Sequence, residues 1–256
     1  MNLFLHGARD FNVTQGDTLR SPNYLWRGSL QTFDCVVANP PFSLKNWGAE
    51  QFGSDIYGRN FWGCPTDSNG DFAWLQHMVK SMDPKTGRCA VVLPQGVLFR
   101  GGKEGEIRKQ LVESDKLEGV ITLTGGVFYS TGVSACILFL NNNKSAEHRR
   151  KVCLIDASGI YTPQRAQNVM TEEDIQRVYS LYSAYEDVIE RVKIATVADI
   201  REKDYTLAIN NYIEKKEQET IPPEEVRRQY FEAYEAMLRA EEKMKKLLLE
   251  GGYVSE

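Results

Sequence analysis

The chain has 256 residues, of which 42% are hydrophobic and 26% are charged, a balance that is ordinary for a soluble globular protein with a sizeable core. Its formal net charge of −4 excludes a uniformly basic nucleic-acid binder, so any contact with DNA must use a local patch. No run approaches the ~20 apolar residues of a membrane span, and residues 1–10 lack the apolar core of a signal peptide. We therefore expect a cytoplasmic protein that does not enter a membrane.

The five cysteines are scattered along the chain, odd in number and mostly placed inside apolar runs. This pattern is typical of reduced core residues in a cytosolic protein rather than of a disulfide framework. The sequence has no CxxC or HxxxH spacing, and its histidines are isolated, so we expect no metal site.

The first stretch that could bind a ligand is the sequence GDTL at residues 16–19. It follows a segment that resembles the end of a helix, closed by Gly7, and a candidate short strand over residues 11–15. Asp17 is either a solvated turn residue or a ligand contact. Its place beside a strand exit favours the ligand contact, because ligands of open α/β sheets bind beyond the carboxyl ends of the strands.

Residues 33–42 read FDCVVANPPF and predict a strand that ends abruptly. The short apolar run CVVA is typical of a strand buried on both faces. The two prolines end it, because each lacks a backbone N–H and restrains the residue before it. The stiff turn presents the Asn39 carboxamide, two backbone carbonyls and the Phe42 ring, which suit a planar, amine-bearing group such as a nucleobase. A plain strand exit closed by an aromatic residue is the alternative.

Residues 45–70 form a long stretch without a regular pattern, and it contains five glycines and five aromatic residues. Loops of this length are usually functional or disordered, and the aromatic residues argue against disorder. Two interpretations remain open, a lid or substrate-binding loop and a packed surface loop.

A strand–helix–strand unit is predicted next. Residues 71–82 have helical apolar spacing, with Ser68 or Asn69 as the expected cap, and residues 89–93 form a second buried strand. The two strands should therefore be parallel, with a right-handed crossover.

Further strands are expected over residues 117–123 and 134–140. The connection between them is too short for a helical crossover, so this pair should be antiparallel. Residues 151–156 are expected to add an edge strand.

Residues 100–109 read RGGKEGEIRK and carry a cluster of basic side chains. The simpler interpretation, which we favour, is a solvated helix start. The alternative is a phosphate-contacting loop at the carboxyl end of the sheet that uses Arg100, Lys103 and Arg108.

The C-terminal part of the chain is predicted to be helical. A helix should open at Thr171 with a capping-box-like sequence, and Pro222 and Pro223 should open a long final helix. In that helix apolar residues recur at alternating steps of four and three, the period of a coiled coil, which favours a partner helix over packing on its own domain. These residues are Val226, Tyr230, Ala233, Met237, Ala240, Met244 and Leu247.

The chain resembles the modification subunit of type I restriction–modification systems, an adenine-N6 DNA methyltransferase. The NPPF sequence alone is shared with other S-adenosylmethionine enzymes that methylate planar amides or amines, but the ordered set of motifs is more specific. The motifs are GDTL (16–19), FDCVVANPPF (33–42), NGDFAWLQHM (69–78), GRCAVVLPQGVLFRGGKEGEIRK (87–109), FYSTGVSACILFL (128–140) and YTLAINNY (205–212).

The resemblance implies an α/β, Rossmann-like, S-adenosylmethionine-dependent methyltransferase fold, with a mixed sheet that ends in an antiparallel hairpin and with a long C-terminal helix. The family's first strands and glycine-rich cofactor loop have no match here, so we expect the fold to be incomplete. Residues 1–165 would be the C-terminal part of the catalytic domain, 166–213 a mixed helical extension and 214–256 a partner-binding helix. The strand before the NPPF sequence would lack a neighbour, which favours self-association or a complementary chain.

The resemblance also implies a mechanism. A target adenine is flipped out of double-stranded DNA, and Asn39 and the Pro40 carbonyl accept the two hydrogens of its exocyclic amine. Pro41 stiffens the turn, Phe42 stacks on the base, and Asp17 accepts a hydrogen bond from the adenine of S-adenosylmethionine. No metal is required.

The implied partners are double-stranded DNA and a DNA specificity subunit docked through the final helix, with a complementary N-terminal half, the restriction subunit or a second copy as further partners. Because the cofactor loop is missing, we expect the chain to be inactive alone. Two other functions stay open. One is a non-catalytic module that only binds partner subunits, and the other is a methyltransferase that acts on a protein glutamine or an RNA base.

Overall fold

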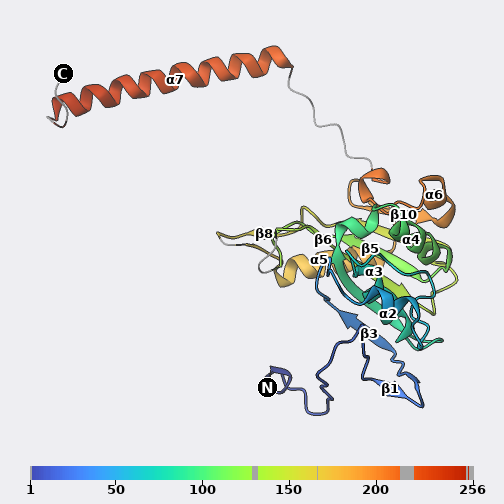
Figure 1. The fold of residues 1–256 in the computed structure, drawn as a ribbon. Helices are drawn as coiled ribbons and strands as arrows, with labels where there is room; N and C mark the ends of the chain where they lie inside the picture. The colour runs from blue at the N-terminus through green and yellow to red at the C-terminus, as the bar shows by residue number, and fades with distance from the viewer. Residues whose placement is uncertain (1, 129–131, 166, 214–221, 252, 254–256) are drawn as a thin grey trace. The chain divides into compact units, whose positions relative to one another are not determined.

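The computed structural model describes residues 2–128, 132–165, 167–213, 222–251 and 253 (Figure 1). The chain divides into two compact units, Met1–Glu214 and Lys215–Glu256. The first unit is built on a six-stranded sheet, and the described part of the second contains one long helix.

The sheet has the strand order β10-β7-β5-β6-β4-β3. The pairs β3–β4 and β5–β7 are parallel, and the pairs β4–β6, β5–β6 and β7–β10 are antiparallel. The parallel strand–helix–strand unit and the antiparallel pair expected from the sequence are thus confirmed. The strands are β3 (Cys35–Ala38), β4 (Arg88–Pro94), β5 (Leu117–Thr122), β6 (Ala135–Asn141), β7 (Lys151–Asp156) and β10 (Val192–Thr196).

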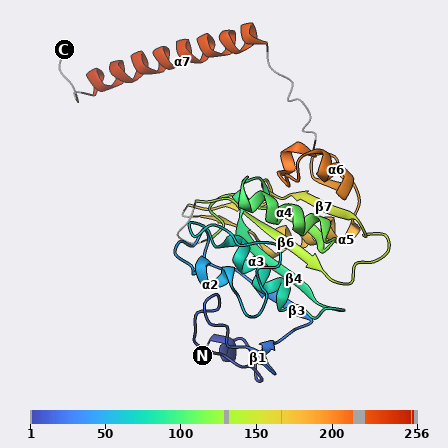
Figure 2. The ribbon, with the colours of Figure 1, turned by 45° about the vertical axis from the view of Figure 1, so that its right-hand side comes forward.

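Helices lie on both faces of the sheet (Figure 2). On one face, α3 (Asp71–Lys80) and α4 (Lys103–Glu113) pack their apolar residues against β4, β5 and β6. On the other face, α5 (Glu172–Ala184) packs Val178 with Ile121 of β5 and Ile155 of β7. Each buried aliphatic side chain contributes roughly 1.5–3 kcal/mol, so these two clusters hold the layers together.

The helix starts follow local capping chemistry. The capping box expected at the start of α5 is confirmed, because the side chains and backbone N–H groups of Thr171 and Asp174 bond reciprocally. α3 starts at Asp71 as expected, but its N-cap is Gly70 rather than Ser68 or Asn69. The Asn69 side chain still accepts the Asp71 N–H at 3.1 Å.

Three expectations about strands are wrong. β3 is not buried on both faces, since Val37 is 71% exposed and β4 is its only strand neighbour within the described residues. Residues 11–15 form no strand. β7 lies inside the sheet rather than at its edge, because β10 pairs along its outer side.

Residues 45–70 are irregular, as expected, apart from the short helix α2 (Ala49–Gly53). Trp47 and Phe52 are almost fully buried and meet edge to face, with ring centroids 5.2 Å apart. A side chain on Gly70 would place its Cβ only 3.0 Å from Cγ of Trp47, so a larger residue there would force the Trp47 ring to shift. This packing favours the packed surface loop over the lid.

The remaining elements of the first unit are short. They are α1 (Asn2–Leu5), the hairpin of β1 (Leu25–Trp26) and β2 (Ser29–Leu30), the 3-10 helix η1 (Gln95–Leu98), the pair β8 (Thr162–Pro163) and β9 (Asn168–Val169), α6 (Val197–Glu202) and the 3-10 helix η2 (Ile209–Asn211).

The second unit contains α7 (Pro223–Glu250), which has proline in its first turn as expected. None of the described residues of α7 is buried. Its coiled-coil positions, which we call the α7 seam, are all exposed; they are Val226, Tyr230, Ala233, Met237, Ala240, Met244 and Leu247. Among the described helices, none is long and apolar enough to cross a membrane.

Candidate functional site

The NPPF turn lies at the carboxyl end of β3, where the backbone leaves the sheet. Asn39 and Pro41 are exposed, whereas Pro40 is buried and Phe42 is half-buried. The turn therefore presents the Asn39 carboxamide to solvent from a backbone that is anchored by a buried proline ring.

The Phe42 ring meets the Phe128 ring edge to face, with centroids 6.0 Å apart and an interplanar angle of 79°. Phe128 belongs to the loop between β5 and β6, so the antiparallel hairpin brings a second aromatic residue to the turn. Phe128 stands in one of the family motifs, but no role of its own was predicted for it. The pair gives no signal in the sequence, because only the sheet order brings the two loops together.

The GDTL turn is a self-contained hydrogen-bonded unit. Oδ1 of Asp17 accepts the backbone N–H groups of Leu19 and Arg20, and Oδ2 accepts Nη1 of Arg20 at 3.1 Å. The hydrogen bond from the Arg20 backbone is the largest cause that lowers the pKa of Asp17. The carboxylate is therefore ionised at neutral pH, and 48% of the side chain stays exposed for a further donor.

Arg20 also joins the GDTL turn to the segment after the NPPF turn. Its Nη2 donates to the carbonyl of Asn46, which follows the NPPF turn in the chain. The structure thus brings the Asp17 turn beside the segment that leaves the NPPF turn, although no strand forms before Asp17.

Arg59 supports the GDTL turn through hydrogen bonds to its backbone. No role was predicted for this residue from the sequence. Its guanidinium is buried and donates to the carbonyls of Thr18 and Leu19 at 3.0 and 2.8 Å. It also pairs with Asp55 at 2.7 Å. Burial alone would raise the pKa of Asp55, but the hydrogen bonds and charge of Arg59 hold it below its ordinary value. A lone arginine in an irregular segment gives no sequence signal for this role.

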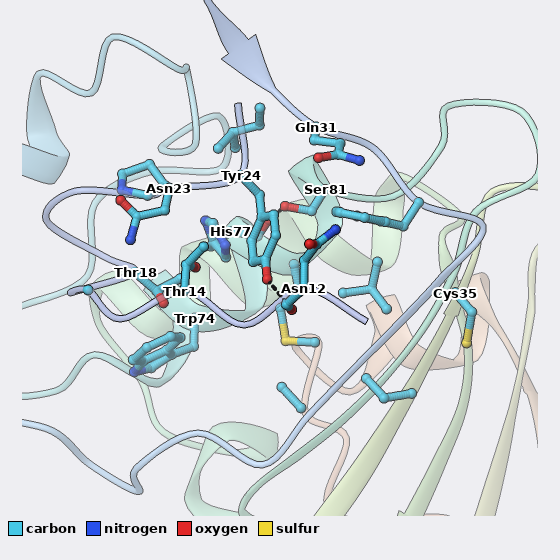
Figure 3. A pocket seen from close by; sticks show the side chains of 18 residues that line it. Asn12, Thr14, Thr18, Asn23, Tyr24, Gln31, Cys35, Trp74, His77 and Ser81 are labelled. Carbon is cyan, nitrogen blue, oxygen red and sulfur yellow. Dashed lines mark hydrogen bonds between the residues drawn. The ribbon is translucent and has the colours of Figure 1, made fainter. Parts of the chain in front are cut away.

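A cavity of about 640 Å³ lies between residues 12–38 and α3, on the open side of β3 (Figure 3). Its lining includes Gly16 and Thr18, which flank Asp17, and Ala38, which precedes Asn39. His77 also lines it, and burial lowers the pKa of its imidazole to about 4. The cavity therefore connects both predicted motifs and has a neutral histidine in its wall.

The three basic residues after β4 have different surroundings. Arg108 is buried and donates to the carbonyls of Tyr205, Val97 and Arg100, whereas Arg100 pairs with Asp71 and Glu104. Burial lowers the pKa of Arg108. Lys103 is exposed at the start of α4. The observed partners of the two arginines are internal, and the DNA contacts predicted for all three residues stay predictions.

A mixed sheet with helices on both faces, and with the NPPF turn at the carboxyl end of a parallel strand, defines an α/β protein of the S-adenosylmethionine-dependent methyltransferase fold. The model of the family described as N-6 DNA Methylase matches residues 1–220. The chain belongs to the N-6 DNA methylase family, and the resemblance stated from the sequence is confirmed.

Individual relatives are methylase subunits of type I restriction enzymes. The chain is 32% identical over 224 residues to the MjaVII methylase subunit of Methanocaldococcus jannaschii, covering 83% of this chain and 38% of that protein. It is 33% identical over 228 residues to the HindI methylase subunit of Haemophilus influenzae, covering 86% of this chain and 49% of that protein. The chain thus spans less than half of the length of each of these two relatives.

Among solved structures, the chain is similar to the methyltransferase subunit of a type I restriction–modification system from Streptococcus thermophilus. The two share 33% sequence identity and superpose with a TM-score of 0.76. The match covers 83% of this chain and 45% of that chain.

Proposed function

We propose that this chain forms the base-holding part of an adenine-N6 DNA methyltransferase in a type I restriction–modification system. The observation that carries the proposal is the NPPF turn at the carboxyl end of β3, with the Phe42 ring against Phe128 and the Asp17 turn tied alongside by Arg20. The family description, N-6 DNA Methylase, supports DNA as the substrate and N6 as the methylated atom, and the relatives' names support a type I restriction system.

The turn supplies the contacts that such a reaction needs. The Asn39 carboxamide oxygen and the Pro40 carbonyl accept the two hydrogens of the exocyclic amine of a flipped adenine, and the Phe42 ring stacks on the base. These bonds favour the pyramidal nitrogen that forms during the reaction, so they strengthen toward the transition state. Because Pro40 is buried, its carbonyl is presented in a fixed orientation.

The residues beside the cavity fit S-adenosylmethionine. The ionised Asp17 carboxylate can accept a hydrogen bond from the cofactor's adenine amine, and the cavity reaches from Gly16 and Thr18 to Ala38. When bound, the cofactor would supply an electrophilic methyl group on a sulfonium. Asn39 and the Pro40 carbonyl would hold the adenine N6 that receives the methyl group, and the surplus proton would leave N6 for solvent.

β3 is the edge strand of the described sheet, and this favours the addition of a strand from another chain. Val37 is 71% exposed there, and an unpaired edge strand is a template for strand addition. We propose that the 256-residue chain alone does not transfer methyl groups, and that a complementary N-terminal half completes the sheet and the cofactor site.

The proposal is tested by titrating the chain with S-adenosylmethionine in a calorimeter, alone and with the N-terminal half of a full-length relative. Tritiated methyl transfer to unmethylated DNA is then measured for the reconstituted pair and for its Asn39→Ala variant. We expect no binding by the chain alone, activity from the pair, and loss of activity in the variant. Unchanged methylation by Asn39→Ala would refute the role given to Asn39.

A second function, binding of partner subunits, is supported by the exposed α7 seam. An apolar stripe at coiled-coil period suits a helix of another chain, and a DNA specificity subunit is the partner that a type I system provides. If the chain is a purely non-catalytic module, the reconstituted pair should bind a specificity subunit but no S-adenosylmethionine. Methylation of RNA or of a peptide glutamine, with DNA unmodified, would instead show that the same turn serves another planar substrate.

A further inference from the structure

Asp71 is the first residue of α3, and its side chain is completely buried. The two oxygens of its carboxylate have partners in different loops. Oδ1 accepts the backbone N–H of Ser43 at 2.8 Å, and Oδ2 accepts Nη2 of Arg100 at 2.6 Å. One buried carboxylate therefore joins the residue that follows the NPPF turn to the loop that follows β4.

Ser43 has a backbone conformation that needs such support. Its φ of +48° lies in the left-handed region, which is unfavourable for a residue with a side chain. The next residue is also tied to the start of α3, because the Leu44 carbonyl accepts the N–H of Gly70 at 2.9 Å. These two hydrogen bonds hold the backbone immediately after Phe42 in one conformation.

Arg100 is itself held in place. Its Nε lies 2.8 Å from Oε2 of Glu104, and its side chain crosses Gly96, where a Cβ would lie only 2.9 Å from Nε. The partly exposed guanidinium compensates the charge of the fully buried Asp71, and hydrogen bonds between charged groups are stronger than those between neutral groups.

We propose that Asp71 is a positioning residue for the NPPF turn. By holding the Ser43 N–H on one oxygen and Arg100 on the other, it sets where the Asn39 carboxamide and the Pro40 carbonyl stand relative to the bound base. The inference rests on the proposed function, because it assigns Asp71 a task at the base-holding turn. A displacement of about 1 Å at a reacting group can lower a rate about a hundredfold, so Asp71 affects turnover without touching the substrate.

The first test measures the turn directly in the 256-residue chain by amide hydrogen exchange. The wild type is compared with Asp71→Asn, which keeps an acceptor for Ser43 but loses the charge, and with Asp71→Ala, which loses both. The control is Val79→Ala, which removes buried apolar volume from the same helix. We expect Ser43 to exchange at least about tenfold faster in Asp71→Ala, and less so in Asp71→Asn.

Exchange at Ser43 in the Val79→Ala control should stay at the wild-type rate when the variants are compared at equal global stability. Unchanged exchange at Ser43 in the Asp71 variants would overturn the inference. If Asp71→Ala does not fold, Asp71→Asn and Arg100→Lys give the same comparison with milder changes.

The second test uses the reconstituted pair and separates kcat from KM. We expect Asp71→Asn to lower kcat for DNA methylation about 10- to 100-fold while KM for S-adenosylmethionine stays within about twofold. An unchanged kcat beside faster exchange would overturn the positioning role. If instead Asn39→Ala leaves methylation unchanged, the proposed function fails, whereas the exchange measurements still decide whether Asp71 holds the turn.

Discussion

Phe42 and Phe128 meet edge to face at the carboxyl end of β3, although they are far apart in the chain. One ring follows a strand at the sheet edge, and the other belongs to the loop between β5 and β6. The contact means that the ring proposed to stack on the base is held from the side by a second ring.

Truncating this aromatic pair should weaken methyl transfer to different degrees. Phe42→Ala removes the stacking surface and should lower kcat/KM for DNA by the equivalent of roughly 1–3 kcal/mol, the range of base–aromatic stacking. Phe128→Leu removes only the ring that packs against Phe42, so it should have a smaller effect. Methylation by the reconstituted pair measures both, with the exposed Phe61→Ala as the control. A larger loss in Phe128→Leu than in Phe42→Ala would contradict these roles.

Arg59 should be essential for folding stability. Arg59→Met leaves the carboxylate of Asp55 buried without its partner and frees the Thr18 and Leu19 carbonyls, so it should cost about 3–5 kcal/mol of the free energy of unfolding. The double variant Arg59→Met/Asp55→Leu also removes the unpaired buried carboxylate, so it should recover part of the lost free energy of unfolding. Urea denaturation followed by circular dichroism gives the values. A double variant as unstable as Arg59→Met would contradict the argument.

His77 should make stability depend on pH between about 6.5 and 4. Burial lowers the pKa of the folded imidazole to about 4, so the unfolded chain takes up the proton first as the pH falls. The stabilisation is complete above the ordinary pKa of 6.5 and is lost as the pH falls toward 4, and the total loss is roughly 3 kcal/mol. Urea unfolding between pH 7 and 5, above the range in which carboxylates titrate, should show a slope that His77→Gln flattens. Equal slopes in the two proteins would exclude His77 as the source.

The open edge of β3 should make the isolated chain self-associate. Val37→Lys places a charge on this edge and should shift the chain toward the monomer without lowering its unfolding free energy, because Val37 is already exposed. Sedimentation velocity over a range of concentrations measures the change. The control is Ile56→Lys, at another exposed apolar residue, and it should behave as the wild type. A wild-type chain that stays monomeric would contradict this prediction.

The α7 seam should be the surface that binds a specificity subunit. Met237→Glu places a charge in the middle of the seam and should abolish co-purification with that subunit. Arg239→Gln changes the net charge by the same amount on the opposite side of the helix and should leave binding intact. Binding that survives Met237→Glu would show that another surface is used.

How much of this protein can be predicted from its sequence depends on the range of the interactions involved. The strand–helix–strand unit, the antiparallel pair, the capping box at Thr171 and the proline start of α7 follow from apolar period, connection length and local hydrogen bonding, and all four are confirmed. Three expectations fail, namely the burial of β3, the strand over residues 11–15 and the edge position of β7. Each of these depends on which segments lie beside a strand, and apolar spacing does not contain that information.

Proline geometry and the order of the motifs are enough to predict the NPPF turn, the acidic turn at Asp17 and the family from the residues alone. The folded chain was needed to show that Arg20 connects the Asp17 turn to the segment after the NPPF turn, that Arg59 and Asp71 support these segments, and that Phe128 meets Phe42. These contacts join residues from separate loops. Their free energy comes from excluding water around charges and rings that meet only when the sheet order is set.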